Sequence, residues 1–453
     1  MKNRHLQFGI AAVSALTVTL AACSSPSGTS PGGEQSQATE TPNSNPVSVL
    51  IGSSGSAETN AVKEAVAAWS QQSGIPAEVK VASNLTQQAT QGFTGGKPDD
   101  VLYVSTDALA GWAGNGSLEA YGDSLPNKAD FYPKLVEAFT IDGRFYCAPK
   151  DFSTLALVIN NKLWKDAGLT DNDIPKTWAD LEAVAKKLTK GKAKGLVLSH
   201  EVQRLGVFMA QAGGGLVTDG KATANSPQNI EGLTFVKKML NDGVAAFNSD
   251  AGAGWGGEAL GKNLAGMVVE GNWITGAKKD YKDLDYTVAA LPTGTQAGTL
   301  QYTNCWGIAA DADNKAGAKS LVEFLTTTQQ QLAFAKAFGV MPSVQSAADG
   351  FKQDNPGMEP FIDGAGYAQN LPAQEGVSAI LSDLNSKLAK LKGGDPKAIL
   401  DGVQADLQAA VGASTRPRTP PPGCGRRPHP GGHGAAGSAT SPRRGGCSSP
   451  RPC

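Results

Sequence analysis

Three tryptophans near the middle of the chain lie outside the predicted helices, where their rings could bind a ligand. Trp255 lies in the glycine-rich loop 251–257, which offers little else for its ring to pack on. Trp273 ends an apolar segment, and Trp306 follows Asn304 by two positions. An indole ring has a large stacking face and an N–H donor, and sugar-binding sites use both. Packing in a hydrophobic core is the alternative for each ring.

Polar side chains near two of these positions could bind hydroxyl groups. Asp151 directly follows Lys150, so its carboxylate could accept hydrogen bonds from a ligand or form a salt bridge with that lysine. Phe152 and Asn304 flank these positions and join the candidate set.

A second group of polar residues follows predicted strands. Ser54 and Ser56 would offer hydroxyl and N–H groups at the start of a helix, an arrangement that suits anions and keeps a phosphorylated ligand open. Asp107 could bind a ligand or cap the next helix. Glu201 and Glu270 are weaker candidates.

Catalytic chemistry has little support in the chain. His200 is the only histidine between residues 47 and 412, and no Gly-x-Ser-x-Gly elbow accompanies it. The chain contains no HExxH, CxxC or Asp-rich calcium loop, so we expect no metal and no cofactor. Asp151 and Glu270 could serve as the acids of a glycosidase, which keeps a secreted glycan-active hydrolase as an alternative to a binding protein.

The elements that would position these residues alternate between strands and helices. Strands are predicted at 47–51, 77–82 and 100–105, with a helix at 57–72 between the first two. This order is typical of an open, parallel α/β sheet, in which ligands bind beyond the carboxyl ends of strands. Further strands are predicted at 153–160, 195–200, 267–271, 286–291 and 299–310, and further helices at 202–211, 226–241, 316–327, 329–338, 375–391 and 396–411.

The first 46 residues indicate export and attachment to a membrane. Lys2 and Arg4 precede the apolar run 8–20, which is too short to span a bilayer. The run ends in Leu-Ala-Ala-Cys23, which resembles the lipobox of bacterial lipoproteins, so we expect cleavage after residue 22 and lipid on Cys23. An ordinary signal peptide with an incidental cysteine is the alternative. The segment 23–46 is polar and predicts a flexible tether.

The last 41 residues, 413–453, differ from the rest of the chain. They contain seven arginines and no acidic residue; removing these seven charges from the net charge of −1 leaves −8. An acidic body argues against nucleic acid as a partner. The segment is rich in Pro, Gly and Arg and predicts a disordered basic tail, or a stretch translated in a shifted frame, and Cys424, Cys447 and Cys453 lack metal-site spacing.

Two cysteines, Cys147 and Cys305, belong to the predicted folded body. An exported protein enters an oxidising compartment, so these two cysteines are predicted to form a disulfide. Two separate buried thiols are the alternative.

Five ordered segments resemble extracellular solute-binding proteins of the maltose-binding type. The resemblance extends over about residues 47–411, and the ordered set is more specific than any one motif. The segments are Pro98-Asp-Asp-Val101, Asp142 to Trp164, Ala167-Gly-Leu with Pro175-Lys-Thr-Trp178, Ala265 to Trp273, and Gly339-Val-Met-Pro-Ser343.

The resemblance implies an α/β protein with the two-lobed periplasmic-binding-protein fold. Open sheets flanked by helices would be joined by three crossing segments, with the ligand in a cleft between lobes that close by hinge motion. We expect lobe 1 to contain 47–150 and 306–345, and lobe 2 to contain 151–305 and 346–412.

The resemblance also implies a function. The chain would be a monomeric receptor on the outer face of the cell membrane that delivers a mono- or oligosaccharide to the transmembrane subunits of an ABC permease. Trp273 would be the stacking tryptophan of that family. A glycerol-phosphate compound is the alternative ligand.

Overall fold

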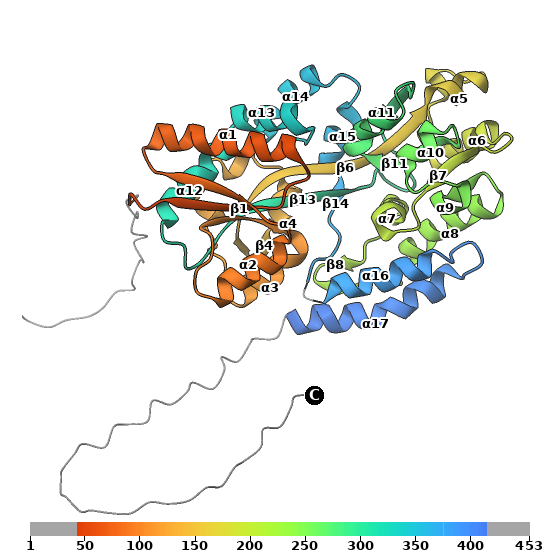
Figure 1. Ribbon diagram of the computed structural model, residues 1–453. Coiled ribbons are helices and arrows are strands. Elements are labelled where there is room, and N and C mark those ends of the chain that lie inside the picture. Colours follow the sequence, from red (N-terminus) through yellow and green to blue (C-terminus); the bar gives the residue numbers. More distant parts are fainter. Residues whose placement is uncertain (1–42, 375, 415–453) are drawn as a thin grey trace, which may run out of the picture. The chain divides into compact units, whose positions relative to one another are not determined.

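The computed structural model describes residues 43–374 and 376–414, which form one compact unit (Figure 1). The predicted signal peptide, Cys23 and the tail from residue 415 lie outside the described residues. In the described part, no helix has the length and apolar character needed to cross a membrane.

The last residues of the predicted tether are bound to the folded body. The side chain of Asn43 donates to the backbone oxygen of Asp313 at 3.2 Å. The amide of Asn314 donates to the backbone oxygens of Asn43 at 3.1 Å and Asn45 at 2.8 Å. Asn43 and Asn45, at the end of the predicted tether, therefore bond to the folded body.

The first strands form a parallel βαβ arrangement, as predicted. β1 (Val47–Ile51) pairs in parallel with β2 (Ala77–Val81) and with β3 (Val101–Ser105). α1 (Ser56–Ser73) connects β1 to β2, and α2 (Leu85–Thr94) connects β2 to β3. The apolar positions of α1 recur at helical spacing, so Val62, Val66 and Trp69 are buried on one face.

Two long strands connect this region to the second half of the molecule. β6 (Ala148–Asn160) and β13 (Thr299–Ile308) run antiparallel to each other, and β13 also pairs with β3. β6 continues into pairing with β11 (Ala265–Gly271). Figure 1 shows β6 and β13 running across the centre of the molecule.

The strands of the two lobes belong to one continuous sheet. The strand order is β10-β7-β11-β6-β13-β3-β1-β2, with β12 paired to β6 and β14 to β13. The reason is the length of β6, whose two ends belong to different lobes. The members of this sheet not yet described are β7 (Lys194–Leu198), β10 (Ala245–Phe247), β12 (Tyr286–Ala289) and β14 (Ala368–Gln369).

Two short hairpins lie outside the main sheet. β4 (Thr140–Ile141) pairs with β5 (Arg144–Phe145), and β8 (Val217–Thr218) pairs with β9 (Lys221–Ala222). Each turn contains an Asp-Gly pair.

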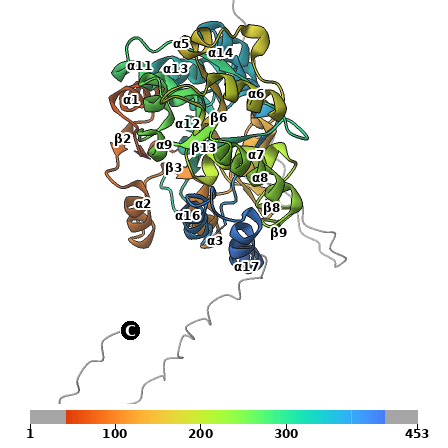
Figure 2. The ribbon, with the colours of Figure 1, turned by 90° about the vertical axis from the view of Figure 1, so that its right-hand side faces the viewer.

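Helices cover both faces of the sheet (Figures 1 and 2). α7 packs on α8, and α16 packs on α17. Thr177 caps the N-terminus of α6, because it accepts from the backbone N–H of Asp180 and donates to its carboxylate. The remaining helices are α3 (Thr106–Gly114), α4 (Pro133–Ala138), α5 (Asn161–Asp166), α6 (Trp178–Leu188), α7 (Val202–Gln211), α8 (Pro227–Asn241), α9 (Asn248–Ala251), α10 (Gly256–Gly261), α11 (Ala277–Asp280), α12 (Lys315–Leu325), α13 (Thr328–Phe338), α14 (Ala348–Asp354), α15 (Glu359–Asp363), α16 (Val377–Leu388) and α17 (Pro396–Ser414).

The hydrophobic core is divided between the two halves. One cluster contains buried residues from 47–148 and 305–347, and another contains residues from 155–300 and 377–407. A third cluster lies between them and includes Phe152 and Met341, whose backbones exchange two hydrogen bonds. This contact joins β6 to the segment that follows α13.

Cys147 and Cys305 form a disulfide. Their Cα atoms are 5.7 Å apart, within the usual range for such a bond. Cys147 lies just before β6 and Cys305 lies within β13, so the disulfide joins the two crossing strands at the edge of lobe 1.

Candidate ligand-binding cleft

Polar residues of β13 form the floor of a cleft between the two lobes. Tyr302, Thr303 and Asn304 are half-buried where β13 passes from one lobe to the other. Asn304 lies opposite Asp151 in the register, and the Thr303 hydroxyl donates to the backbone oxygen of Asp151 at 2.6 Å. The crossing strand therefore presents hydroxyl and amide groups at the junction between the lobes.

A cavity of about 500 Å³, called the inner cavity below, opens above this floor. Two of the ligand-binding residues predicted from the sequence, Asp107 and Asn304, line this cavity. Its volume is in the range of known ligand pockets. The other lining residues are Ser105, Thr106, Gln203, Gln301, Tyr302, Thr303, Asn370, Leu371, Pro372, Ala373, Ser378, Leu381, Ser382 and Asn385.

Asp107 does not cap α3, although the sequence allowed it. The N-cap residue of α3 is Ser105, and Asp107 is exposed in the first turn of the helix. A carboxylate in the first turn is favourable for the helix dipole, and at this position it also faces the inner cavity.

Trp273 is an exposed indole in a fixed orientation. It is 36% exposed, one of two large hydrophobic residues with such exposure among the described residues. Its indole N–H donates to Glu270 at 2.9 Å, and its ring meets the edge of the Tyr302 ring with 6.0 Å between centroids. Tyr302 lines the inner cavity, so Trp273 contacts one of the lining residues, although it is not itself among them.

Glu270 holds the surroundings of Trp273 in place. It is 2% exposed and forms a salt bridge of 3.0 Å with Arg204, whose guanidinium lies 5.0 Å from the centre of the Trp273 ring. The other oxygen of Glu270 accepts from the backbone N–H of Gly256 at 3.3 Å. Glu270, a weaker candidate from the sequence, is therefore a positioning residue.

Trp255 is half-buried and precedes α10. Its ring lies so close to Gly257 that a Cβ atom at that glycine would be 2.1 Å from the indole Cη2. The glycines of this loop allow the ring to fold back, and it packs against a buried cluster. The structure thus provides the core contact that the sequence left as the alternative.

A buried ionic cluster lies below the other end of the cleft. Lys150 bonds to Glu58 at 3.0 Å and to Asp151, and these three side chains are at most 11% exposed. The Tyr103 hydroxyl donates to Glu58 at 3.1 Å, and the Lys150 ammonium lies 4.6 Å from the centre of the Tyr103 ring. Asp151 therefore forms the salt bridge that the sequence offered as the alternative to ligand binding.

The pKa values in this cluster follow from burial and charge. Burial raises the pKa of Glu58, but Lys150 and the hydrogen bonds from Ser54 outweigh it and lower the pKa overall. For Asp151, burial outweighs Lys150 and raises the pKa. Burial lowers the pKa of Lys150, yet Asp151, Tyr103 and Glu58 raise it overall, so Lys150 stays charged.

A carboxylate of the protein already binds the donor groups at the start of α1. The backbone N–H and the hydroxyl of Ser54 donate to the Glu58 carboxylate at 2.8 and 2.7 Å. Ser56 is exposed at the first position of α1. The predicted anion site is therefore occupied at Ser54 by the protein's own carboxylate.

Two predicted ligand residues are buried in hydrophobic cores. Trp306 has no exposed surface and packs edge-on against Tyr103, with 4.9 Å between ring centroids. Phe152 is 1% exposed and packs against Tyr132, with centroids 5.2 Å apart. Neither side chain lines the inner or the outer cavity. For Trp306, the β-bulge between Asn304 and Cys305 breaks the alternation that would place it on the same face as Asn304.

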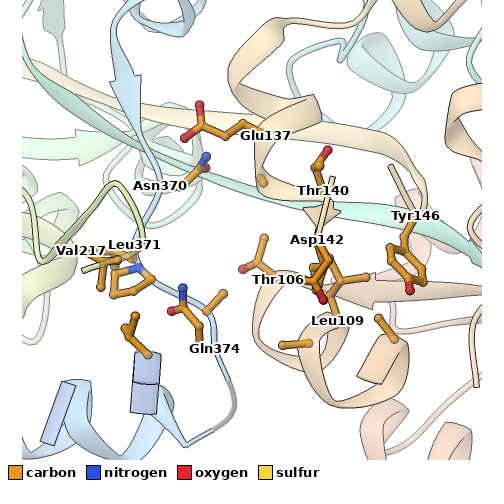
Figure 3. A pocket seen from close by; sticks show the side chains of 18 of the residues that line it. Thr106, Leu109, Glu137, Thr140, Asp142, Tyr146, Val217, Asn370, Leu371 and Gln374 are labelled. Carbon is orange, nitrogen blue, oxygen red and sulfur yellow. The ribbon is translucent and has the colours of Figure 1, made fainter. Parts of the chain in front are cut away.

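A second cavity, called the outer cavity below, has a volume of about 950 Å³ (Figure 3). Figure 3 shows Thr106, Asp142 and Tyr146 on one side of it and Val217, Leu371 and Gln374 on the other. It is also lined by Leu109, Ala110, Ala113, Gly114, Glu137, Ala138, Thr140, Ile141, Asp219, Gly220, Asn370, Pro372, Ala373 and Val411.

Several lining residues escaped the sequence analysis. Gln203 follows the helix start at Val202, and Tyr302 belongs to the same strand as the candidate Asn304. The alternation of β13 could have indicated Tyr302, because it lies two positions from Asn304. Asn370 and Asn385 come from the C-terminal segment, for which no sequence signal pointed to the cleft.

The chain matches the family of bacterial extracellular solute-binding proteins over residues 64–360, more than half of its length. It belongs to that family. A curated relative, the diacetylchitobiose binding protein DasA of Streptomyces coelicolor, is 24% identical over 322 residues, which cover 68% of this chain and 75% of DasA.

Solved structures with the same fold come from several bacteria. The cyclic α-maltosyl-1,6-maltose binding protein of Arthrobacter globiformis is 18% identical, with a TM-score of 0.71, covering 81% of this chain and 98% of that one. UgpB of Mycobacterium tuberculosis, solved with glycerophosphocholine, is also 18% identical, with a TM-score of 0.68, covering 83% of this chain and all of the other. These likenesses confirm the predicted two-lobed α/β fold.

Proposed function

We propose that this protein is the substrate receptor of an ABC importer and that its ligand is a sugar. The observation that carries the proposal is the exposed ring of Trp273, which is held by Glu270 and contacts Tyr302, a residue that lines a cavity with amide and hydroxyl groups. Such a ring can stack on the apolar face of a pyranose while the polar groups bind its hydroxyls. The names of relatives that bind chitobiose and maltose compounds support this choice.

The contacts favour an uncharged sugar over a glycerol-phosphate compound. The N–H and hydroxyl groups of Ser54 bind Glu58, and Arg204 is paired with Glu270. A phosphate would have to displace one of these carboxylates. We also propose that the protein binds without catalysing a reaction, because His200 packs against Phe247 and the buried carboxylates Asp151 and Glu270 are each paired with a cation.

The test is isothermal titration calorimetry with a panel of neutral malto- and chito-oligosaccharides. We expect a member of the panel to bind, and Trp273→Ala to weaken its binding about tenfold or more, corresponding to about 1.4 kcal/mol. Val81→Ala is the matched control, since Val81 is also a large exposed hydrophobic residue, at 47%. Unchanged affinity in the Trp273 variant would exclude the proposed stacking contact.

The export signal leads to a separate proposal about location. We propose that lipid on Cys23 holds the receptor at the outer face of the cell membrane, as a monomer beside the permease, where a tether raises its local concentration. Mass spectrometry of the membrane-bound protein should find a diacylated N-terminal cysteine. Cys23→Ala should release the protein from the membrane fraction, and retention of that variant would contradict the proposal.

A further inference from the structure

The inner and outer cavities are neighbours with a shared wall. Thr106 and the four residues 370–373 line both of them. Beyond this shared wall the inner cavity reaches Tyr302, which contacts Trp273, and the outer cavity reaches Asp142 and Gln374. The two volumes, about 500 and 950 Å³, together exceed the range of about 300–1,000 Å³ that is usual for a compact ligand.

The outer cavity has one hairpin turn from each predicted lobe. Asp142 and Gly143 form the turn between β4 and β5, and Asp219 and Gly220 form the turn between β8 and β9. Both aspartates have a positive φ, 51° and 49°, which this turn type requires and which Asp-Gly pairs adopt readily. A ligand in this cavity would therefore contact both lobes.

Two amide oxygens along this path have no partner among the described residues. Gln301 lines the inner cavity, is 4% exposed, and donates through its Nε2 to Asn370 at 2.8 Å, while its Oε1 accepts no bond. Gln374 lines the outer cavity and its Oε1 is likewise buried without a donor. Buried amide oxygens normally have a donor, so these two positions suit a ligand rich in hydroxyl groups.

The charged residues that line the two cavities are all acidic. They are Asp107, Glu137, Asp142 and Asp219, and no lysine, arginine or histidine is among the lining residues of either cavity. An anionic ligand would enter this space without a compensating cation and would be repelled.

We propose that the two cavities form one elongated subsite path for an uncharged oligosaccharide, whose outer units lie between the Asp142 and Asp219 hairpins. This inference rests on the proposed function. It adds that the receptor selects for chain length in the outer cavity and against negative charge along the whole path. One end of the oligosaccharide would stack on Trp273.

Calorimetry with a chain-length series tests the length selection. The probes are maltose to maltohexaose and the corresponding chito-oligosaccharides, because both contain one repeated neutral unit. We expect the dissociation constant to fall at least about tenfold between the shortest member that binds and the longer members, a difference of about 1.4 kcal/mol. Equal affinity along both series would overturn the proposed path.

Ala110→Trp tests the role of the outer cavity separately from that of the inner cavity. Ala110 is on α3 and lines the outer cavity but not the inner one, so an indole at this position should occupy part of the outer cavity. We expect this variant to lose the tenfold gain of the longer chains and to bind the shortest ligand within about twofold of the wild type. The matched control is Ala67→Trp, because Ala67 is exposed on another helix, α1. A variant that keeps the full gain would overturn the assignment of the outer units.

The charge selection is tested with an acidic version of the best ligand. A chain oxidised to a terminal carboxylate should bind at least about tenfold more weakly than its neutral parent. Asp142→Asn with Asp219→Asn should reduce this difference, and asparagine tolerates the positive φ. Equal binding of the acidic and neutral chains would overturn the charge selection.

The proposed function and the extended path fail in different ways. If no neutral sugar of any length binds, the proposed function fails. Binding that does not depend on chain length leaves the proposed function intact and rejects only the extended path.

Discussion

Replacement of Lys150 by methionine would test how the buried ionic cluster contributes to stability. The ammonium is shared by Glu58 and Asp151, and all three side chains are nearly excluded from solvent. Methionine keeps most of the length and apolar volume of lysine but leaves two carboxylates buried without their cation. Phe338 and Tyr103, which lie 5.4 and 4.6 Å from the ammonium, can still pack on the methionine.

The expected loss is large for a single substitution. Removal of one partner from a buried ion pair costs about 3–5 kcal/mol. Unfolding entropies of about 2.1 cal/mol/K per residue give about 0.8 kcal/mol/K for a body of about 370 residues. We therefore expect the melting temperature to fall by about 4–6 °C near neutral pH.

The loss should also depend on pH. In the native protein the pKa of Glu58 is lowered, so its stabilising effect is complete above 4.5 and is lost as the pH falls through its folded pKa. The raised pKa of Asp151 acts in the opposite sense: its contribution is complete below 3.8 and is lost as the pH rises through its folded pKa. Without Lys150 both pKa values should rise, so the variant should be closest to the wild type in mild acid.

Differential scanning calorimetry of both proteins at about pH 7.5 and about pH 5 measures this difference. Lys63→Met on α1 is the control, because Lys63 is an exposed lysine on the same helix as Glu58. The reasoning is refuted if Lys150→Met melts within about 1 °C of the wild type, or if its deficit is the same at both pH values.

Three further substitutions test the fold. Cys147→Ser with Cys305→Ser opens a loop of 158 residues and should cost about 2–5 kcal/mol, measured as a lower midpoint in urea. Thr177→Ala removes the cap of α6 and should cost about 1 kcal/mol in the same assay, while Thr177→Ser should not. Gly232→Ala places a Cβ 2.5 Å from the backbone oxygen of Phe208 and should destabilise by about 1–3 kcal/mol, outweighing the helix propensity of alanine.

The sequence predicted many of the helices and strands well, because their hydrophobic periods are regular. The predicted helix at 57–72 differs by one residue at each end from α1. β6 was predicted to begin at Ser153 but begins at Ala148, because Lys150 and Asp151 are charged residues that a buried strand usually excludes. Their mutual pairing and Glu58 compensate for that cost, and no local pattern reveals a partner 92 residues away.

The site was predicted in part. Asp107 was chosen because it follows a predicted strand, Asn304 because it flanks other candidates, and Trp273 because of a motif, and all three signals are local in sequence. The side of a crossing strand to which Trp306 points depends on the register with β3, which pairs it with Tyr103. This register is set by long-range pairing, so the sequence left the core and the cleft as alternatives for Trp306.

The disulfide limits where the two lobes can move relative to each other. Cys147 and Cys305 clamp the lobe 1 ends of β6 and β13, and the pairing of these strands shifts by a β-bulge between Asn304 and Cys305. We therefore expect the pivot to lie on the lobe 2 side of the disulfide, from Asp151 onward. The clamp would keep β6 and β13 in fixed register at the lobe 1 end during hinge motion, so an open and a closed receptor would differ in the relative orientation of the lobes and not within lobe 1.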